Sequence, residues 1–172
     1  MMMTDRRVQR MAAGLAFLVY AATAAEAAQT LGRHADWTSF AHAEQNGILC
    51  FVLSQPKDRL PKNAKRDSAY FYISTRPAAG VEAEVSVKLG YPLKHGSETT
   101  ITVDTTAFRL FVQGERAFAG DPQDEKKLLD AMRKGKRMVV QATSERGTVT
   151  RDTYSLAGLS QALQTVAASC KP

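Results

Sequence analysis

The sequence has few of the residues from which catalytic and metal centres are usually built. Its 172 residues include two cysteines and three histidines, His34, His42 and His95. These histidines show no zinc-ligand spacing, and there is no C-x-x-C redox motif. Glycine-rich phosphate loops and dinucleotide-binding fingerprints are also missing. We therefore predict neither a metal site nor a cofactor.

Two local patterns resemble catalytic motifs but are better explained by structure. Residues Gly158 to Ala162 lack the final glycine of a nucleophile elbow, no histidine follows them, and their serine falls inside a predicted helix. Asp121, Asp124 and Glu125 form an acidic group, but carboxylates stabilise the N-terminus of a helix. We expect Asp152 to pair with a cationic group or to accept a backbone hydrogen bond. We predict no catalytic residues, and an enzyme with an unrecognised polar site is the weaker alternative.

Long apolar runs are also scarce, and the one that exists lies at the N-terminus. Arg6, Arg7 and Arg10 precede an apolar segment from Met11 to Ala25, and the small-residue motif Ala25-Glu26-Ala27 follows it. This order is typical of a secretory signal peptide, which we place at residues 1–27. The apolar segment is shorter than the roughly 20 residues of a membrane-spanning helix. An uncleaved anchor is the alternative.

Cleavage after Ala27 would leave residues 28–172, a length that favours a single domain. No stretch in this part approaches the length of a membrane span, so we expect no transmembrane segment after signal cleavage. Two cysteines in an exported chain most simply form one disulfide, here between Cys50 and Cys170. Two free thiols are the alternative.

The formal net charge of +6 comes partly from two clusters of basic residues. One cluster lies in a proline-containing polar segment, Gln55 to Asp67, which we interpret as a surface loop; the other lies at the end of a predicted helix. Their members are Lys57, Arg59, Lys62, Lys65 and Arg66, and then Arg133, Lys134, Lys136 and Arg137. Either cluster could bind an anionic envelope component, and an ordinary solvated face is the alternative. We expect no nucleic-acid partner for an exported chain.

Alternation of apolar and polar residues predicts a mainly β protein. The apolar run Ile48 to Leu53, which contains Cys50, is typical of a buried strand, and period-two alternation marks the half-buried strands. The alternating segments are 69–75, 83–89, 101–103 and 108–112, and two further strands cover 138–143 and 148–154. Turns recur every 8 to 12 residues. We predict a two-layer, immunoglobulin-like β-sandwich with two short helices.

Helix signals place one helix after Asp121 and a second at the C-terminus. Asp121 is a suitable N-cap, Pro122 suits the first helical position, and Gly135 can adopt the left-handed closing conformation. We expect Ser155 to cap the closing helix, whose apolar stripe ends at Cys170 and packs on the sandwich. Residues 28–33 look like an unstructured lead-in.

Three segments taken together resemble the invasion-associated locus B family of exported bacterial proteins. They are Val85 to Pro92, Ala131 to Val140, and Thr143 to Thr148 continuing into Asp152 to Leu156. The resemblance spans Trp37 to Cys170, and an early strand cysteine paired with a C-terminal one also matches the family. It implies a periplasmic or outer-membrane-associated β-sandwich. The family name comes from members linked to entry of pathogens into host cells, and no catalytic residue set carries over.

We therefore expect an exported, non-enzymatic cell-envelope protein that acts by binding. Its partner would be an envelope protein, an anionic envelope component or a host surface, and a structural role in envelope maintenance is the alternative. An aromatic surface patch or an open sheet edge would favour a protein partner. A polar pocket with shifted titrating groups would favour an enzyme.

Overall fold

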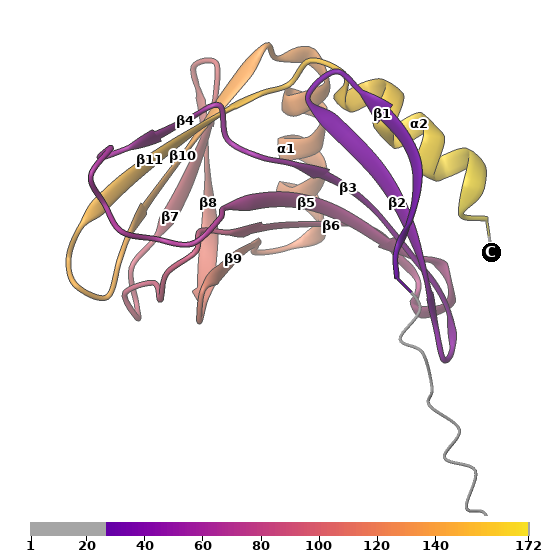
Figure 1. Ribbon diagram of the computed structural model, residues 1–172, viewed down its shortest axis with the longest axis horizontal. Coiled ribbons are helices and arrows are strands. Elements are labelled where there is room, and N and C mark those ends of the chain that lie inside the picture. The colour runs from indigo at the N-terminus through magenta and orange to yellow at the C-terminus, as the bar shows by residue number, and fades with distance from the viewer. Residues whose placement is uncertain (1–26, 172) are drawn as a thin grey trace, which may run out of the picture.

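The computed structural model describes residues 27–171, so the predicted signal peptide lies outside the described residues except for Ala27. The described chain forms one antiparallel sheet, two α-helices and a short 3-10 turn (Figure 1). The strands are β1 (Gln29–His34), β2 (Trp37–Glu44), β3 (Gly47–Ser54), β4 (Asp58–Leu60), β5 (Tyr70–Arg76), β6 (Val81–Lys88), β7 (Thr99–Val103), β8 (Thr106–Gln113), β9 (Arg116–Ala119), β10 (Arg137–Thr143) and β11 (Val149–Ser155). The helices are α1 (Pro122–Lys134) and α2 (Leu159–Ser169), and the turn η1 covers Pro77–Ala79.

The sheet has 11 strands in the order β1-β2-β3-β5-β6-β9-β8-β7-β10-β11-β4 and folds back on itself. Phe71 of β5 and Tyr154 of β11 belong to strands far apart in that order, yet their ring centroids are 5.7 Å apart. The Trp37 indole on β2 donates a hydrogen bond to the Ser155 carbonyl on β11. The two halves of one curved sheet therefore face each other as two layers. The predicted mainly β, two-layer class is confirmed.

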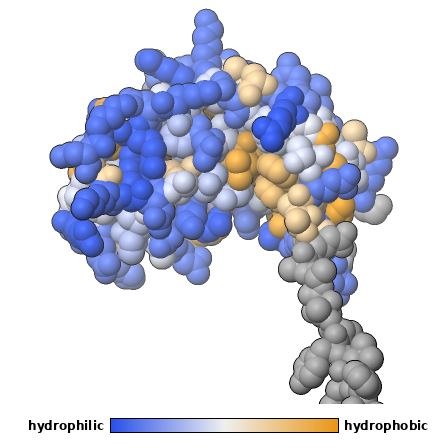
Figure 2. Space-filling model, in the orientation of Figure 1, coloured by the Kyte–Doolittle hydropathy of each residue, from blue (hydrophilic) through white to orange (hydrophobic). Residues whose placement is uncertain are grey.

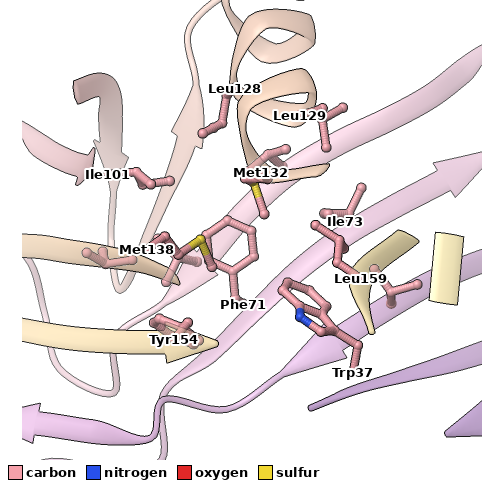
Figure 3. Close-up of a cluster of buried hydrophobic side chains, with 14 of the residues drawn as sticks. Trp37, Phe71, Ile73, Ile101, Leu128, Leu129, Met132, Met138, Tyr154 and Leu159 are labelled. Carbon is pink, nitrogen blue, oxygen red and sulfur yellow. The ribbon is translucent and has the colours of Figure 1, made fainter. Parts of the chain in front are cut away.

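Both helices contribute apolar side chains to a single core. Helix α1 buries Leu128, Leu129 and Met132, and Figure 3 shows Met132 next to Phe71 of β5 and Leu128 on the side of Ile101 of β7. Helix α2 packs on β1, β2 and β3 at the other side of the fold. The predicted inward face of each alternating strand is the buried one: Phe71 and Ile73, for example, have exposed fractions of 0% and 1%.

The start of α1 agrees with the sequence, whereas its end differs. The Asp121 carboxylate accepts hydrogen bonds from the backbone N–H groups of Gln123 and Asp124, at 2.8 and 3.0 Å. Gly135 was expected in the left-handed region, but its φ of −78° is ordinary extended backbone. Glycine is nevertheless required there for space, because a Cβ would lie 2.6 Å from Val103 Cγ1.

Two expectations about the ends of the fold are wrong. Helix α2 begins after Gly158 and not at Ser155, because Leu156 is held in the sheet by a hydrogen bond to the Lys136 carbonyl. Residues 28–33 are not an unstructured lead-in, since β1 pairs with β2 in a hairpin. The β1 sequence lacks regular alternation, and its pairing with β2 shifts register between Thr30 and Gly32.

The disulfide fastens α2 to the sheet as predicted. Cys50 on β3 and Cys170 just after α2 are joined, with Cα atoms 6.3 Å apart and 120 positions between them in the sequence. Both residues are buried. The buried Ser39 hydroxyl adds a hydrogen bond to the Ala162 carbonyl of α2 at 2.9 Å. The C-terminal helix is therefore part of the core.

Candidate binding surfaces

The segment Gln55 to Asp67, interpreted above as a basic surface loop, is partly built into the sheet. Its residues Asp58–Leu60 form β4, which pairs with β11. Two of its cations turn toward the buried carboxylate of Asp152: Arg66 Nη2 lies 2.6 Å from Oδ1, and Arg59 Nε lies 3.9 Å from Oδ2. The Arg66 side chain is only 3% exposed. Arg66 therefore belongs to an internal ion pair rather than to an open basic surface.

Burial governs the titration of this cluster. It raises the pKa of Asp152, and the hydrogen bond from Arg66 opposes that shift. The expectation that Asp152 pairs with a cation is confirmed. Burial also raises the pKa of the Tyr91 phenol, which shares a hydrogen bond with the Thr150 hydroxyl. At neutral pH this tyrosine is therefore protonated and is not a base.

A polar pocket of about 740 Å³ lies next to this ion pair. Arg66, Tyr91 and Thr150 line it, together with Ser144, whose hydroxyl accepts a hydrogen bond from the Thr148 backbone. Among the described residues that line the pocket there is neither histidine nor cysteine. The charged residues Lys65, Asp67, Glu115, Glu145 and Arg146 also line it. The Tyr91 and Ser144 hydroxyl groups already form hydrogen bonds with Thr150 and with the Thr148 backbone.

The remaining members of the two basic clusters lie on the surface. Lys57 and Lys62 form ion pairs with Asp36 and Asp58, and Lys65 is exposed. The second cluster lies at the C-terminal end of α1 and the start of β10. Its members Arg133, Lys134, Lys136 and Arg137 are all exposed. The structure thus leaves the second cluster as the more open concentration of positive charge.

The histidines lie apart and serve different local roles. His34 on β1 shares a hydrogen bond of 3.0 Å with the Thr165 hydroxyl of α2, whereas His95 lies in an exposed turn. Ser160 is an exposed residue in the first turn of α2, as predicted. Across residues 27–171 there is no group of three or more histidine, cysteine, aspartate or glutamate side chains positioned to hold a metal ion.

The structure adds an aromatic surface that the sequence analysis did not identify. It lies on the outer side of β2, β3, β5, β9 and β8, opposite the core. We call it the outer aromatic face, and its rings are Phe40, Phe51, Tyr70, Tyr72, Phe111 and Phe118. Apolar side chains gather on the visible surface over β2 and β3 (Figure 2). In the run Ile48 to Leu53, Cys50 and Val52 point inward and Phe51 outward, but the uniformly apolar sequence does not distinguish the two sides.

Close ring contacts organise this face into two groups. Phe40 and Phe51 stack at 5.0 Å between centroids, and Phe51 lies 6.1 Å from Tyr72. Phe111 and Phe118 stack at 5.5 Å, and Phe111 is 50% exposed. Between the groups, the Arg116 guanidinium lies 5.0 Å from the centroid of the Tyr72 ring. The result is a row of rings with a cation in its middle.

Comparison with known proteins gives consistent results. A family model described as "Invasion associated locus B (IalB) protein" matches residues 37–167. The fold is similar to the crystal structure of invasion associated protein B from Bartonella henselae, with a TM-score of 0.60 and 15% sequence identity. That similarity covers 81% of this chain and 95% of the other. A comparison with curated proteins finds no match. In the part of the chain that the structure describes, no helix combines the length and apolar character needed to cross a bilayer.

Proposed function

The chain belongs to the invasion-associated locus B family, and from that premise we propose that it is an exported, non-enzymatic envelope protein that binds another envelope protein through the outer aromatic face. Export is supported by the signal-like N-terminus and by the disulfide, which is typical of oxidising compartments. Intact mass of the periplasmic protein should correspond to a chain that starts at Ala28.

The outer aromatic face is the observation that carries the proposal. Phenylalanine, tyrosine and arginine are enriched in protein interfaces, and tyrosine and arginine are frequent among the few residues that contribute most of the binding energy. Here Phe40 and Phe51 form a stacked pair that the core does not need, since the other side of β2 and β3 buries Trp37 and Val52. Apolar rings held on the outer side of a rigid sheet suit a preformed binding surface better than a reaction centre.

Charge-led binding to an anionic envelope component has weaker support. Lys57 and Lys62 already have carboxylate partners, and Arg66 is buried with Asp152. The exposed cluster from Arg133 to Arg137 retains that role as a second candidate surface. High salt should disrupt contacts made by that cluster and should affect the aromatic contact much less.

Site-specific photo-crosslinking in intact cells tests the proposal. A photoreactive phenylalanine analogue replaces Phe51, and a matched control carries it at Val149, which is 53% exposed on β11. We expect a discrete cross-linked protein product from position 51 and none from position 149. Phe40→Ala should weaken capture at position 51 by about 30-fold, the effect of losing one interface hot spot. Equal products from both positions, or none from position 51, would contradict the proposal.

A further inference from the structure

A second concave site lies between the two helices, away from the outer aromatic face. It is a cavity of about 440 Å³, which is within the usual range for small-molecule sites. Strands β5 and β6 contribute to its lining, as does one side of α2. The apolar residues that line it are Ile73, Val81, Ala83, Leu163, Val166 and Ala167.

The cavity exists because part of β6 has no covering element. Strand β9 pairs with Ser86–Lys88 and then turns away into α1. Val85 and Val87 of β6 are fully buried, whereas Val81 and Ala83, which lie near a register shift in the pairing of β6 with β5, are only partly buried and line the cavity. These two side chains therefore present an apolar floor that neither helix covers.

Helix α2, which lines the cavity opposite α1, is held in place by a disulfide and by hydrogen bonds. Cys170 itself lines the cavity, and its disulfide to Cys50 ties the end of α2 to β3. Hydrogen bonds from Ser39 to the Ala162 carbonyl and between His34 and Thr165 fix α2 further toward its start. The cavity is thus preformed, which lowers the entropic cost of binding a ligand.

Two charged side chains, Arg133 and Glu82, reach the cavity. The Arg133 side chain is 50% exposed, and its ion-pair contact with Asp130 is long, at 3.6 Å. Lys134, Lys136 and Arg137 follow Arg133 in the chain and are exposed, but they do not line the cavity. Among the described residues that line the cavity, Arg133 is the cation that could bind an acidic head group.

We propose that this cavity binds a single-chain anionic amphiphile, with its acyl chain between α2 and β6 and its acidic head at Arg133. The proposal is independent of the outer aromatic face, which lies on other residues. The same ligand chemistry is offered by a free fatty acid and by an anionic membrane lipid. A free fatty acid would displace a probe from the cavity in solution, and a membrane lipid would recruit the protein to vesicles.

The test uses a fluorescent, dansylated undecanoic acid and the mature protein with its disulfide intact. Ala167→Phe fills the cavity from an exposed position of α2, and Ala168→Phe places the same bulk on the next exposed residue, outside the lining. We expect at least about a tenfold loss of probe affinity for Ala167→Phe, because the chain loses several buried methylene contacts. Ala168→Phe should bind as the parent does. Equal affinity of both variants would overturn the proposal.

The head group is tested by competition between dodecanoate and dodecanol. Arg133→Gln should raise the dodecanoate concentration needed to displace the probe about fivefold, as expected for the loss of a partly exposed ion pair. The dodecanol concentration needed should not change. Glu82→Gln should strengthen dodecanoate binding, and Lys134→Gln, which lies outside the lining, should have a smaller effect than Arg133→Gln. Displacement by dodecanol as effective as that by dodecanoate in the parent protein would overturn the assignment of Arg133.

Binding to lipid vesicles distinguishes a membrane lipid from a free fatty acid as the ligand. Binding to phosphatidylglycerol vesicles but not to phosphatidylcholine vesicles, lost in Ala167→Phe and retained in Ala168→Phe, would identify a membrane lipid. Displacement of the probe by dodecanoate without vesicle binding would identify a free acid. Failure of the probe, dodecanoate and both vesicles to bind would overturn the proposal, and it would leave the photo-crosslinking result at Phe51 unaffected.

Discussion

Breaking the buried ion pair between Arg66 and Asp152 should destabilise the protein more than any surface substitution. The Asp152 side chain is fully buried between Arg66 at 2.6 Å and Arg59 at 3.9 Å. Asp152→Asn keeps the size of the side chain but leaves the Arg66 cation, only 3% exposed, without a countercharge. Arg59 is 29% exposed and can still reach water. The cost therefore falls mainly on Arg66.

Breaking a buried ion pair by removing one partner costs about 3–5 kcal/mol. At pH 7 we expect about 3 kcal/mol for Arg66→Met, which leaves the buried carboxylate with only the more distant Arg59. Asp152→Asn should cost less, because burial raises the pKa of Asp152 and so favours an uncharged group at this position in the folded state. At about 2–4 °C per kcal/mol, Arg66→Met should lower the Tm by about 6–12 °C. Such a loss is a large part of the roughly 5–15 kcal/mol that stabilises a typical domain.

The pH dependence gives a second signature. Burial raises the pKa of Asp152 above its ordinary value of 3.8, and Arg66 opposes this shift. A carboxyl group with a raised pKa binds its proton more tightly in the folded state, so stability falls as pH rises from 3.8 through the raised pKa. Arg66→Met raises that pKa further. Its deficit should therefore be largest at neutral pH and shrink on acidification.

Urea unfolding at pH 7 and pH 4, followed by fluorescence of the single tryptophan, Trp37, measures both effects. Lys62→Met is the control, because it removes an exposed ion pair with Asp58 and should leave the midpoint unchanged. The double variant Arg66→Met with Asp152→Asn should lose less than the sum of the two single losses. Additive losses, or a deficit of Arg66→Met that does not change with pH, would refute the reasoning.

Two further predictions concern the chain ends and a close backbone approach. Cys50→Ser and Cys170→Ser should each cost about 5 kcal/mol by the loop-entropy estimate, with little further loss in the double variant. Additive losses in urea unfolding would argue against one shared bond. Gly158→Ala should lower the Tm more than Gly96→Ala: both have positive φ, but only at Gly158 would a Cβ collide with the His34 carbonyl. Equal Tm values for the two glycine variants would show that the contact is unimportant.

Several features follow from local sequence because local chemistry determines them. Alternation in β5 and β6 correctly identified the buried side of each strand, since successive side chains point to opposite faces. Asp121 caps α1 because a carboxylate satisfies free N–H groups wherever a helix starts. The pairing of Cys50 with Cys170 followed from their number and the predicted export. None of these inferences needed the position of a distant segment.

Binding surfaces were predicted less well, because long-range packing decides which polar and apolar residues remain exposed. In the sequence, Arg66 lies in a polar segment that resembles a surface loop. It contacts Asp152, 86 positions away, only because the folded chain places this segment beside β11. The run Ile48 to Leu53 is uniformly apolar, so its pattern does not reveal that Phe51 faces outward. The ion-pair cluster and the outer aromatic face thus depend on strand order.

The β-rich class, the closing helix and the cysteine pair could be predicted from the amino-acid sequence, because they depend on periodicity, caps and residue counts. Tertiary structure alone decided that the two layers are one folded sheet, since strand order is set by contacts among segments far apart in the chain. It also decided that β6 is left partly uncovered between α1 and α2. The alternation of apolar and polar residues along a strand indicates which side of the strand is apolar. The neighbouring elements determine whether that side is covered.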